Sequence, residues 1–195
     1  PDYFKIKKEK DNRVTAEVIG LEYEEHLTSL GYPHPYQNLV KLELEERIRN
    51  SSGKYRALVV MPTGSGKTRT AVEFMIDFIR SRKNSNVLWI VESPNLSEQS
   101  LQTFYDLWKL RGDRLLKVHR CYTGFVPEIN FSNGTNIIFG AFDKMKGLQN
   151  NNDDFFNSLK KSTDLMIIDE AHFSLSETYE EVISDIERNS DDIIK

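Results

Sequence analysis

Short apolar runs alternate with longer amphipathic stretches along most of the chain. The runs are only a few residues long, as expected of parallel strands that are buried on both faces. Between them, apolar residues recur three and four positions apart, as on one face of a helix. The expected strands are 57–61, 87–91, 117–122, 136–140 and 165–168, and the expected helices are 36–49, 67–80 and 97–109. This alternation predicts an α/β domain, with a mostly parallel sheet covered by helices on both faces.

The first 31 residues do not fit this alternation. Residues 3–19 have the pattern of a β-hairpin, although a helix over residues 14–30 fits the same periodicity. Pro33 and Pro35 then interrupt the chain, since each proline disfavours helical geometry in the residue before it. We therefore expect an N-terminal appendage over residues 1–31 and a main domain over residues 32–195. Polar residues also predict a loop over 147–154.

Composition and charge narrow the class of protein. The 195 residues carry a formal net charge of −4, so no global basic field points to nucleic acid, although one basic strip would suffice. Cys121 is the only cysteine, which excludes an intramolecular disulfide, and we expect it to be buried. No apolar run approaches the ~20 residues that span a bilayer, and we find no signal peptide. We expect a cytoplasmic protein without membrane contact.

The strongest motif is Met-Pro-Thr-Gly-Ser-Gly-Lys-Thr at 61–68, between an expected buried strand and an expected helix. The glycines allow backbone torsions that point N–H groups at phosphate oxygens, and the start of the helix adds further unpaired donors. Lys67 supplies a cation for the β and γ phosphates, and Thr68 offers a hydroxyl to Mg²⁺. The nucleotide-binding residues are expected to be Pro62, Thr63, Gly64, Ser65, Gly66, Lys67 and Thr68.

A second motif, Asp169-Glu170-Ala171-His172, follows the expected strand 165–168. An aspartate at the carboxyl end of a buried strand, beside the strand that leads into the phosphate loop, can reach Mg²⁺. The adjacent Glu170 points elsewhere and can orient or deprotonate the attacking water. Together the two motifs predict an ATPase that uses Mg²⁺, with Lys67, Asp169 and Glu170 as its catalytic residues.

These two motifs, with Gln37 upstream, resemble those of superfamily 2 helicases of the DEAH/DExH type. Within that group the chain is most similar to the motor domains of type III and type I restriction enzymes, over residues 32–173. The resemblance implies a RecA-like P-loop NTPase fold and the first of two motor domains of a helicase or translocase. Met61, where the strict phosphate-loop pattern has glycine, fits the looser helicase pattern. His172 lies too far along the chain to touch the metal readily and would report nucleotide state to another segment.

Pro35-Tyr36-Gln37 resembles the adenine-reading segment of these helicases, with His34 where arginine is usual. The resemblance implies that Gln37 hydrogen-bonds the adenine edge through its amide and that Tyr32 or Tyr36 stacks on the base. The alternative is that Tyr36 merely packs and Gln37 merely begins a helix.

Two segments correspond to the family's nucleic-acid contacts, and both depart from the usual pattern. Ser93 and Pro94 replace the usual arginines, and Ala141 replaces a phosphate-binding threonine. The remaining contacts would come from Ser93, Asn95, Thr123, Gly124, Lys144 and Lys146, although the two lysines fit a solvated face equally well. We expect nucleic acid as the partner, DNA in preference to RNA, with a weakened grip.

Two functions from different classes remain open. The first is an ATP-driven nucleic-acid motor, and the second is an ATP-dependent binding module or switch that moves nothing. A P-loop kinase or GTPase fits poorly, because no guanine-reading Asn-Lys-x-Asp segment is present. The sequence contains no second RecA-like domain and no arginine finger after His172. We therefore expect the isolated chain to bind ATP and to hydrolyse it poorly.

Overall fold

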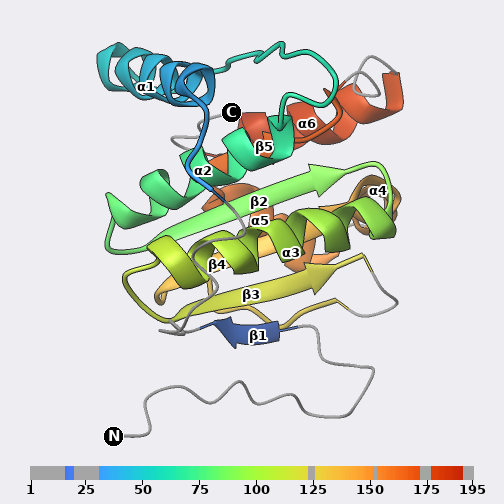
Figure 1. Cartoon of the computed structure of the whole chain (residues 1–195). Helices are drawn as coiled ribbons and strands as arrows, with labels where there is room; N and C mark the ends of the chain where they lie inside the picture. The colour runs from blue at the N-terminus through green and yellow to red at the C-terminus, as the bar shows by residue number, and fades with distance from the viewer. Residues whose placement is uncertain (1–15, 20–30, 123–125, 152, 172–176, 191–195) are drawn as a thin grey trace, which may run out of the picture.

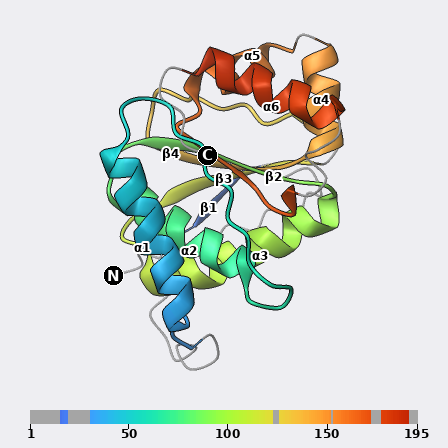
Figure 2. The ribbon, with the colours of Figure 1, turned by 90° about the horizontal axis from the view of Figure 1, so that it is seen from above.

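The computed structural model describes residues 16–19, 31–122, 126–151, 153–171 and 177–190, which form three layers with a sheet in the middle (Figure 1). One face of the sheet is covered by α2 (Lys67–Arg80) and α3 (Pro94–Arg111), and α1 (Pro35–Asn50) lies outside α2 (Figure 2). The opposite face is covered by α4 (Phe142–Asn150), α5 (Asp154–Ser162) and α6 (Glu177–Asn189). None of the described helices combines the length and apolar character that crossing a bilayer requires.

Four parallel strands and one antiparallel edge strand form the sheet. The elements are β1 (Ala16–Ile19), β2 (Ser85–Val91), β3 (Leu116–Cys121), β4 (Thr135–Ala141) and β5 (Leu165–Ile168), in the spatial order β1-β3-β4-β2-β5. The predicted parallel α/β sheet is confirmed. Ala16–Ile19 pairs antiparallel with β3, which supports the strand and not the helix alternative for this segment, while residues 3–7 lie outside the described residues.

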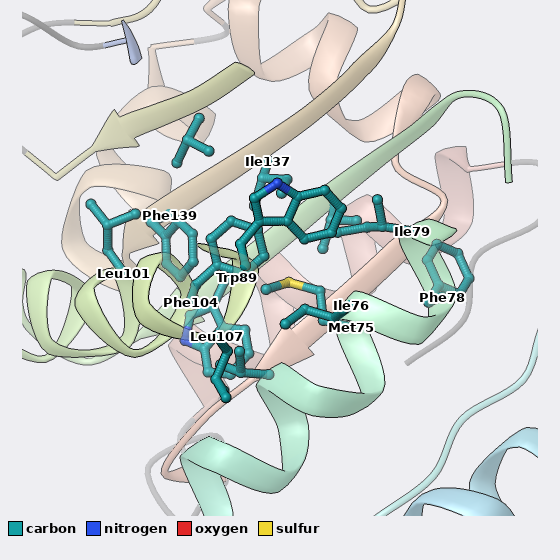
Figure 3. Packing of buried hydrophobic residues seen from close by; sticks show 14 of the residues in the cluster. Met75, Ile76, Phe78, Ile79, Trp89, Leu101, Phe104, Leu107, Ile137 and Phe139 are labelled. Atoms are coloured by element: carbon teal, nitrogen blue, oxygen red, sulfur yellow. The ribbon is translucent and has the colours of Figure 1, made fainter. Parts of the chain in front are cut away.

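The larger hydrophobic core lies between the sheet and the pair α2 and α3. Figure 3 shows Trp89 and Phe139 of the central strands against Phe104 of α3 and Met75 of α2. All four side chains have no exposed surface, and burying each one fully contributes roughly 1.5–3 kcal/mol or more. This packing fixes the two central strands relative to α2, the helix that follows the phosphate loop.

The predicted strand 57–61 is wrong, because these residues form no strand. They belong to the connection between α1 and α2, which runs outside the sheet (Figure 1), and Leu58 and Val60 are 78% and 85% exposed. β5, the expected neighbour, pairs with β2 along one edge and with no described strand along the other. An apolar run becomes a strand only where another strand takes up its backbone hydrogen bonds.

The predicted loop 147–154 is also wrong over most of its length. α4 continues to Asn150 and α5 begins at Asp154, so only residues 151–153 lie between the two helices. Asp153 begins α5 by accepting a hydrogen bond from the Phe155 amide at 2.8 Å. Polar residues of this segment belong to the exposed faces of two amphipathic helices. The buried side chains of these helices are Phe142, Met145, Leu148, Phe156 and Leu159.

A buried polar ladder joins β3, β4 and β2. Asn136 donates a hydrogen bond to Asn86 at 2.9 Å, and His119 Nε2 lies 3.4 Å from Asn136 Oδ1. Asn86 also donates to the Ser162 carbonyl at 3.0 Å, at the end of α5. Because desolvation disfavours a charged imidazole, burial lowers the pKa of His119 to about 4, and the hydrogen bond with Asn136 opposes this shift.

Acidification is expected to destabilise the fold through His119. The unfolded chain binds a proton at His119 near pH 6.5 and the folded chain only near pH 4, so stability is lost as the pH falls between these values. The loss is at most about 3 kcal/mol. Urea unfolding of the wild type and of His119→Gln between about pH 7 and pH 4 measures it. We expect a flatter stability profile for the variant, and equal profiles would contradict the prediction.

Candidate functional site

The candidate site lies at the carboxyl edge of the parallel sheet. β5 ends at Ile168, and the next residue, Asp169, donates its amide hydrogen to the Ile90 carbonyl of β2 at 3.1 Å. This bond continues the strand pairing by one residue and fixes where the Asp169 backbone lies. The side chain of Asp169 accepts a hydrogen bond from Thr68 Oγ1 at 2.7 Å. The two motifs, about 100 residues apart in the sequence, are therefore in direct contact.

The phosphate loop turns through two glycines with left-handed backbone torsions. Gly64 has φ 76° and Gly66 has φ 78°, values that residues with a Cβ atom adopt rarely. A Cβ on Gly66 would also lie 2.6 Å from the Gln37 amide nitrogen. Between the glycines, the Ser65 amide and hydroxyl both donate to the Pro62 carbonyl, at 3.2 and 2.6 Å. These two hydrogen bonds form a tight turn over residues 62–65, directly before α2 begins.

The start of α2 is left without the usual protein partners. Its N-cap residue is Gly66, no side chain caps the helix, and no acidic residue lies in its first turn. The first amides of a helix have no partner within the helix and carry the positive end of its dipole. Lys67, in this first turn, makes no ion pair with another described residue. This end of α2 concentrates positive potential beside the loop.

Glu170 has a strained backbone. Its φ of 57° is the only positive value among the non-glycine residues that the structure describes, and such a conformation costs about 1–3 kcal/mol. The Glu170 amide donates to Asp169 Oδ1 at 3.0 Å, so one oxygen of Asp169 holds this turn while the other faces Thr68. His172 lies outside the described residues.

The start of α1 rests on the phosphate loop. Tyr36 Oη and Gln37 Nε2 both donate to the Ser65 carbonyl, at 2.9 and 3.0 Å. Gln37 Oε1 accepts from the His34 amide at 2.8 Å, which fixes the orientation of the Gln37 amide and leaves it one N–H and one acceptor position. Gln37 is only 4% exposed, whereas Tyr36 is 44% and Tyr32 97% exposed.

The expected nucleic-acid residues that the structure describes follow β2 and β4, at the same edge of the sheet. Ser93 is the N-cap of α3, with its hydroxyl accepting from the Leu96 amide at 3.4 Å, and Asn95 is exposed in the first turn. Ala141 is buried at the end of β4, and Lys144 is half-buried on α4. Lys146 pairs with Glu181 of α6. Thr123 and Gly124 lie outside the described residues.

Sequence reasoning missed an ion pair at this edge. Arg120, near the end of β3, binds both carboxylate oxygens of Glu98 on α3, at 3.1 and 3.0 Å. The Arg120 hydrogen bond lowers the pKa of Glu98 against the opposing effect of burial. The two residues are 22 positions apart and no pattern joins them. The expectation for Cys121 next to this pair is confirmed, because the thiol is buried and burial raises its pKa to about 12.

Residues 31–191 match the protein family described as type III restriction enzyme, res subunit. The chain belongs to this family. The resemblance to restriction-enzyme helicases of superfamily 2, seen in the two motifs, is thereby confirmed.

Two individual proteins are also similar to parts of the chain. The endonuclease subunit of the type I restriction enzyme EcoKI from Escherichia coli strain K12 is 39% identical over 61 residues, which is 31% of this chain and 5% of that subunit. A solved structure of the type ISP restriction-modification enzyme LlaGI, with its nuclease deleted and a DNA substrate mimic bound, matches with a TM-score of 0.57 at 15% identity. This match covers 84% of the chain and 17% of that enzyme, and it supports the RecA-like fold.

Proposed function

We propose that this chain binds ATP·Mg²⁺ and serves as the first motor domain of a DNA-dependent ATPase. One observation carries the proposal. The hydroxyl of Thr68, directly after the phosphate-loop lysine, meets the first carboxylate of the Asp-Glu-Ala-His motif at 2.7 Å. A glycine-rich turn and an uncapped helix start lie beside this contact.

The side chains of the site fit ATP·Mg²⁺. Mg²⁺ prefers oxygen ligands and usually takes only one or two from the protein, the others being water and phosphate oxygens. Thr68 Oγ1 and Asp169 Oδ2 offer two such ligands next to each other. When bound there, Mg²⁺ neutralises charge on the β and γ phosphates.

Each remaining residue has a distinct role in this proposal. Lys67 binds the terminal phosphates, together with the amides at the start of α2. Glu170 positions the attacking water and accepts its proton, and its backbone turn is held by the carboxylate that binds the metal. Tyr36 and Gln37 bring the base side of the site against the phosphate loop through the Ser65 carbonyl.

The family and the LlaGI structure, which has a DNA substrate mimic bound, support DNA as the partner. This chain spans 5% and 17% of the two proteins compared, and a role in a larger DNA-dependent motor is part of the proposal. A second function is an ATP-dependent switch that binds DNA without moving along it. It is favoured by Ser93 and Pro94, which replace the usual arginines, and by Ala141, whose side chain has no group to offer a phosphate.

Two measurements on residues 1–195 test the proposal. Calorimetric titration is expected to show ATP binding that depends on Mg²⁺. Phosphate release is then followed with and without single-stranded and double-stranded DNA or RNA. Hydrolysis by this chain alone is expected to be slow, so the readout is the ratio of the rates with and without polymer. A rate that rises with DNA supports the motor, whereas DNA binding that requires ATP with no rise in rate supports the switch. An absence of ATP binding would overturn both.

A further inference from the structure

One face of α2 carries a ladder of charged residues. Arg69, Glu73 and Asp77 are spaced four residues apart and therefore lie on one side of the helix. Arg111, at the end of α3, binds Asp77 at 2.7 Å and also pairs with Glu73. Arg69 lies 3.8 Å from Glu73. Only 3% of the Glu73 side chain is exposed, so the ladder is largely withdrawn from solvent.

The first and last residues of this ladder on α2 contact the first and last residues of the segment 31–41. At one end, Arg69 donates a hydrogen bond to the Gly31 carbonyl at 2.6 Å. At the other end, Lys41 of α1 pairs with Asp77 at 2.6 Å, with 12% and 23% of the two side chains exposed. The residues that contact the Ser65 carbonyl, Tyr36 and Gln37, lie between these two points.

We propose that this ladder is a positioning device for the base side of the nucleotide site, with Lys41 as its principal residue. The proposal rests on the function proposed above, ATP binding at the phosphate loop. Lys41 lies one helical turn after Gln37 and thus on the same face of α1. Its ion pair sets the distance between α1 and α2, and hence the position of Tyr36 and Gln37 above Ser65.

The rest of α1 offers little to replace this contact. Gln37 is the only buried residue of the helix, and Leu44 and Ile48 are only partly buried against the core. Leu39 and Leu42 are 67% and 57% exposed on the outer side. A charge-assisted contact between largely buried side chains is worth more than a surface ion pair. We therefore expect Lys41 to stabilise the position of α1 on α2 more than the exposed charges of α1 do.

The experiment replaces Lys41 by methionine, which keeps the aliphatic part of the side chain. Asp77 remains paired with Arg111 in this variant, so no buried carboxylate loses its only partner. The ligands are ATP·Mg²⁺ and inorganic tripolyphosphate·Mg²⁺, which shares the phosphates and lacks the base. We expect Lys41→Met to weaken ATP binding about tenfold and to leave tripolyphosphate binding unchanged.

Two further variants make the result specific. Lys41→Arg keeps the charge and is expected to restore most of the ATP affinity. Arg47→Met removes an ion pair with Glu43 on the same helix whose side chains are 61% and 62% exposed, and it is expected to change neither affinity. Unchanged ATP binding in Lys41→Met, or an equal loss for both ligands, would overturn the positioning role. Wild-type protein that binds neither ligand would instead refute the proposed function.

Discussion

Replacing Lys67 by alanine is expected to weaken ATP·Mg²⁺ binding about 30-fold or more. The side chain lies in the first turn of α2, where neither a capping side chain nor an acidic residue competes with a bound anion. Truncating one member of a charged, hydrogen-bonded pair costs about 2–5 kcal/mol of binding, and each 1.4 kcal/mol corresponds to about a factor of ten. Calorimetric titration of the variant with ATP·Mg²⁺ measures the loss.

The loss should not come from unfolding. Lys67 is only half-buried and belongs to neither hydrophobic core, so the free energy of unfolding is expected to change by less than about 0.5 kcal/mol. Lys83→Ala is the matched control, because it removes an exposed lysine just after the other end of α2. We expect wild-type ATP affinity in this control. An ATP affinity in Lys67→Ala equal to that of the control would refute the assignment of the phosphate loop.

The glycine turn at 64–66 and the strand before Asp169 were predictable from the sequence, because both depend on local chemistry. Glycine at positions 64 and 66 is tied to the positive φ values observed there. Asp169 follows a short apolar run that is a strand in the structure. Thr68 and Asp169 were each expected to reach Mg²⁺, and their direct contact emerged only in the structure, since no local pattern encodes a pairing across about 100 residues.

Features that depend on distant partners were not predictable. Residues 57–61 have the composition of a buried strand, but strand formation depends on a neighbour that the run itself does not specify. In the sequence, nothing distinguishes Glu73 and Asp77 from charged residues on a solvent-exposed helix face. Their ion pairs with Arg111 of α3, and the pair of Asp77 with Lys41 of α1, are visible only in the structure. Gln37 was expected to hydrogen-bond the adenine base of ATP, and its hydrogen bond to the Ser65 carbonyl emerged only in the structure.

The two carboxylates after β5 are expected to have separable roles. Asp169 has one oxygen facing the Thr68 hydroxyl and the other fixed by the Glu170 amide. A carboxylate held in this way suits a metal ligand, whose position must not change during the reaction. Glu170 follows with a left-handed backbone, and we assign this second carboxylate to the attacking water. Asp169→Asn should therefore weaken the dependence of ATP binding on Mg²⁺.

Glu170→Gln should instead leave ATP·Mg²⁺ affinity unchanged and reduce hydrolysis by about 10²–10⁴-fold, the usual contribution of a general base. Glutamine has nearly the same shape and keeps the strained turn, but it cannot accept a proton from water. Phosphate release under single-turnover conditions, with protein in excess over ATP, measures the chemical step directly. Binding of each variant is titrated separately with and without Mg²⁺. If Asp169→Asn and Glu170→Gln lose binding and hydrolysis in the same proportions, the two carboxylates act as one unit and the division of roles is wrong.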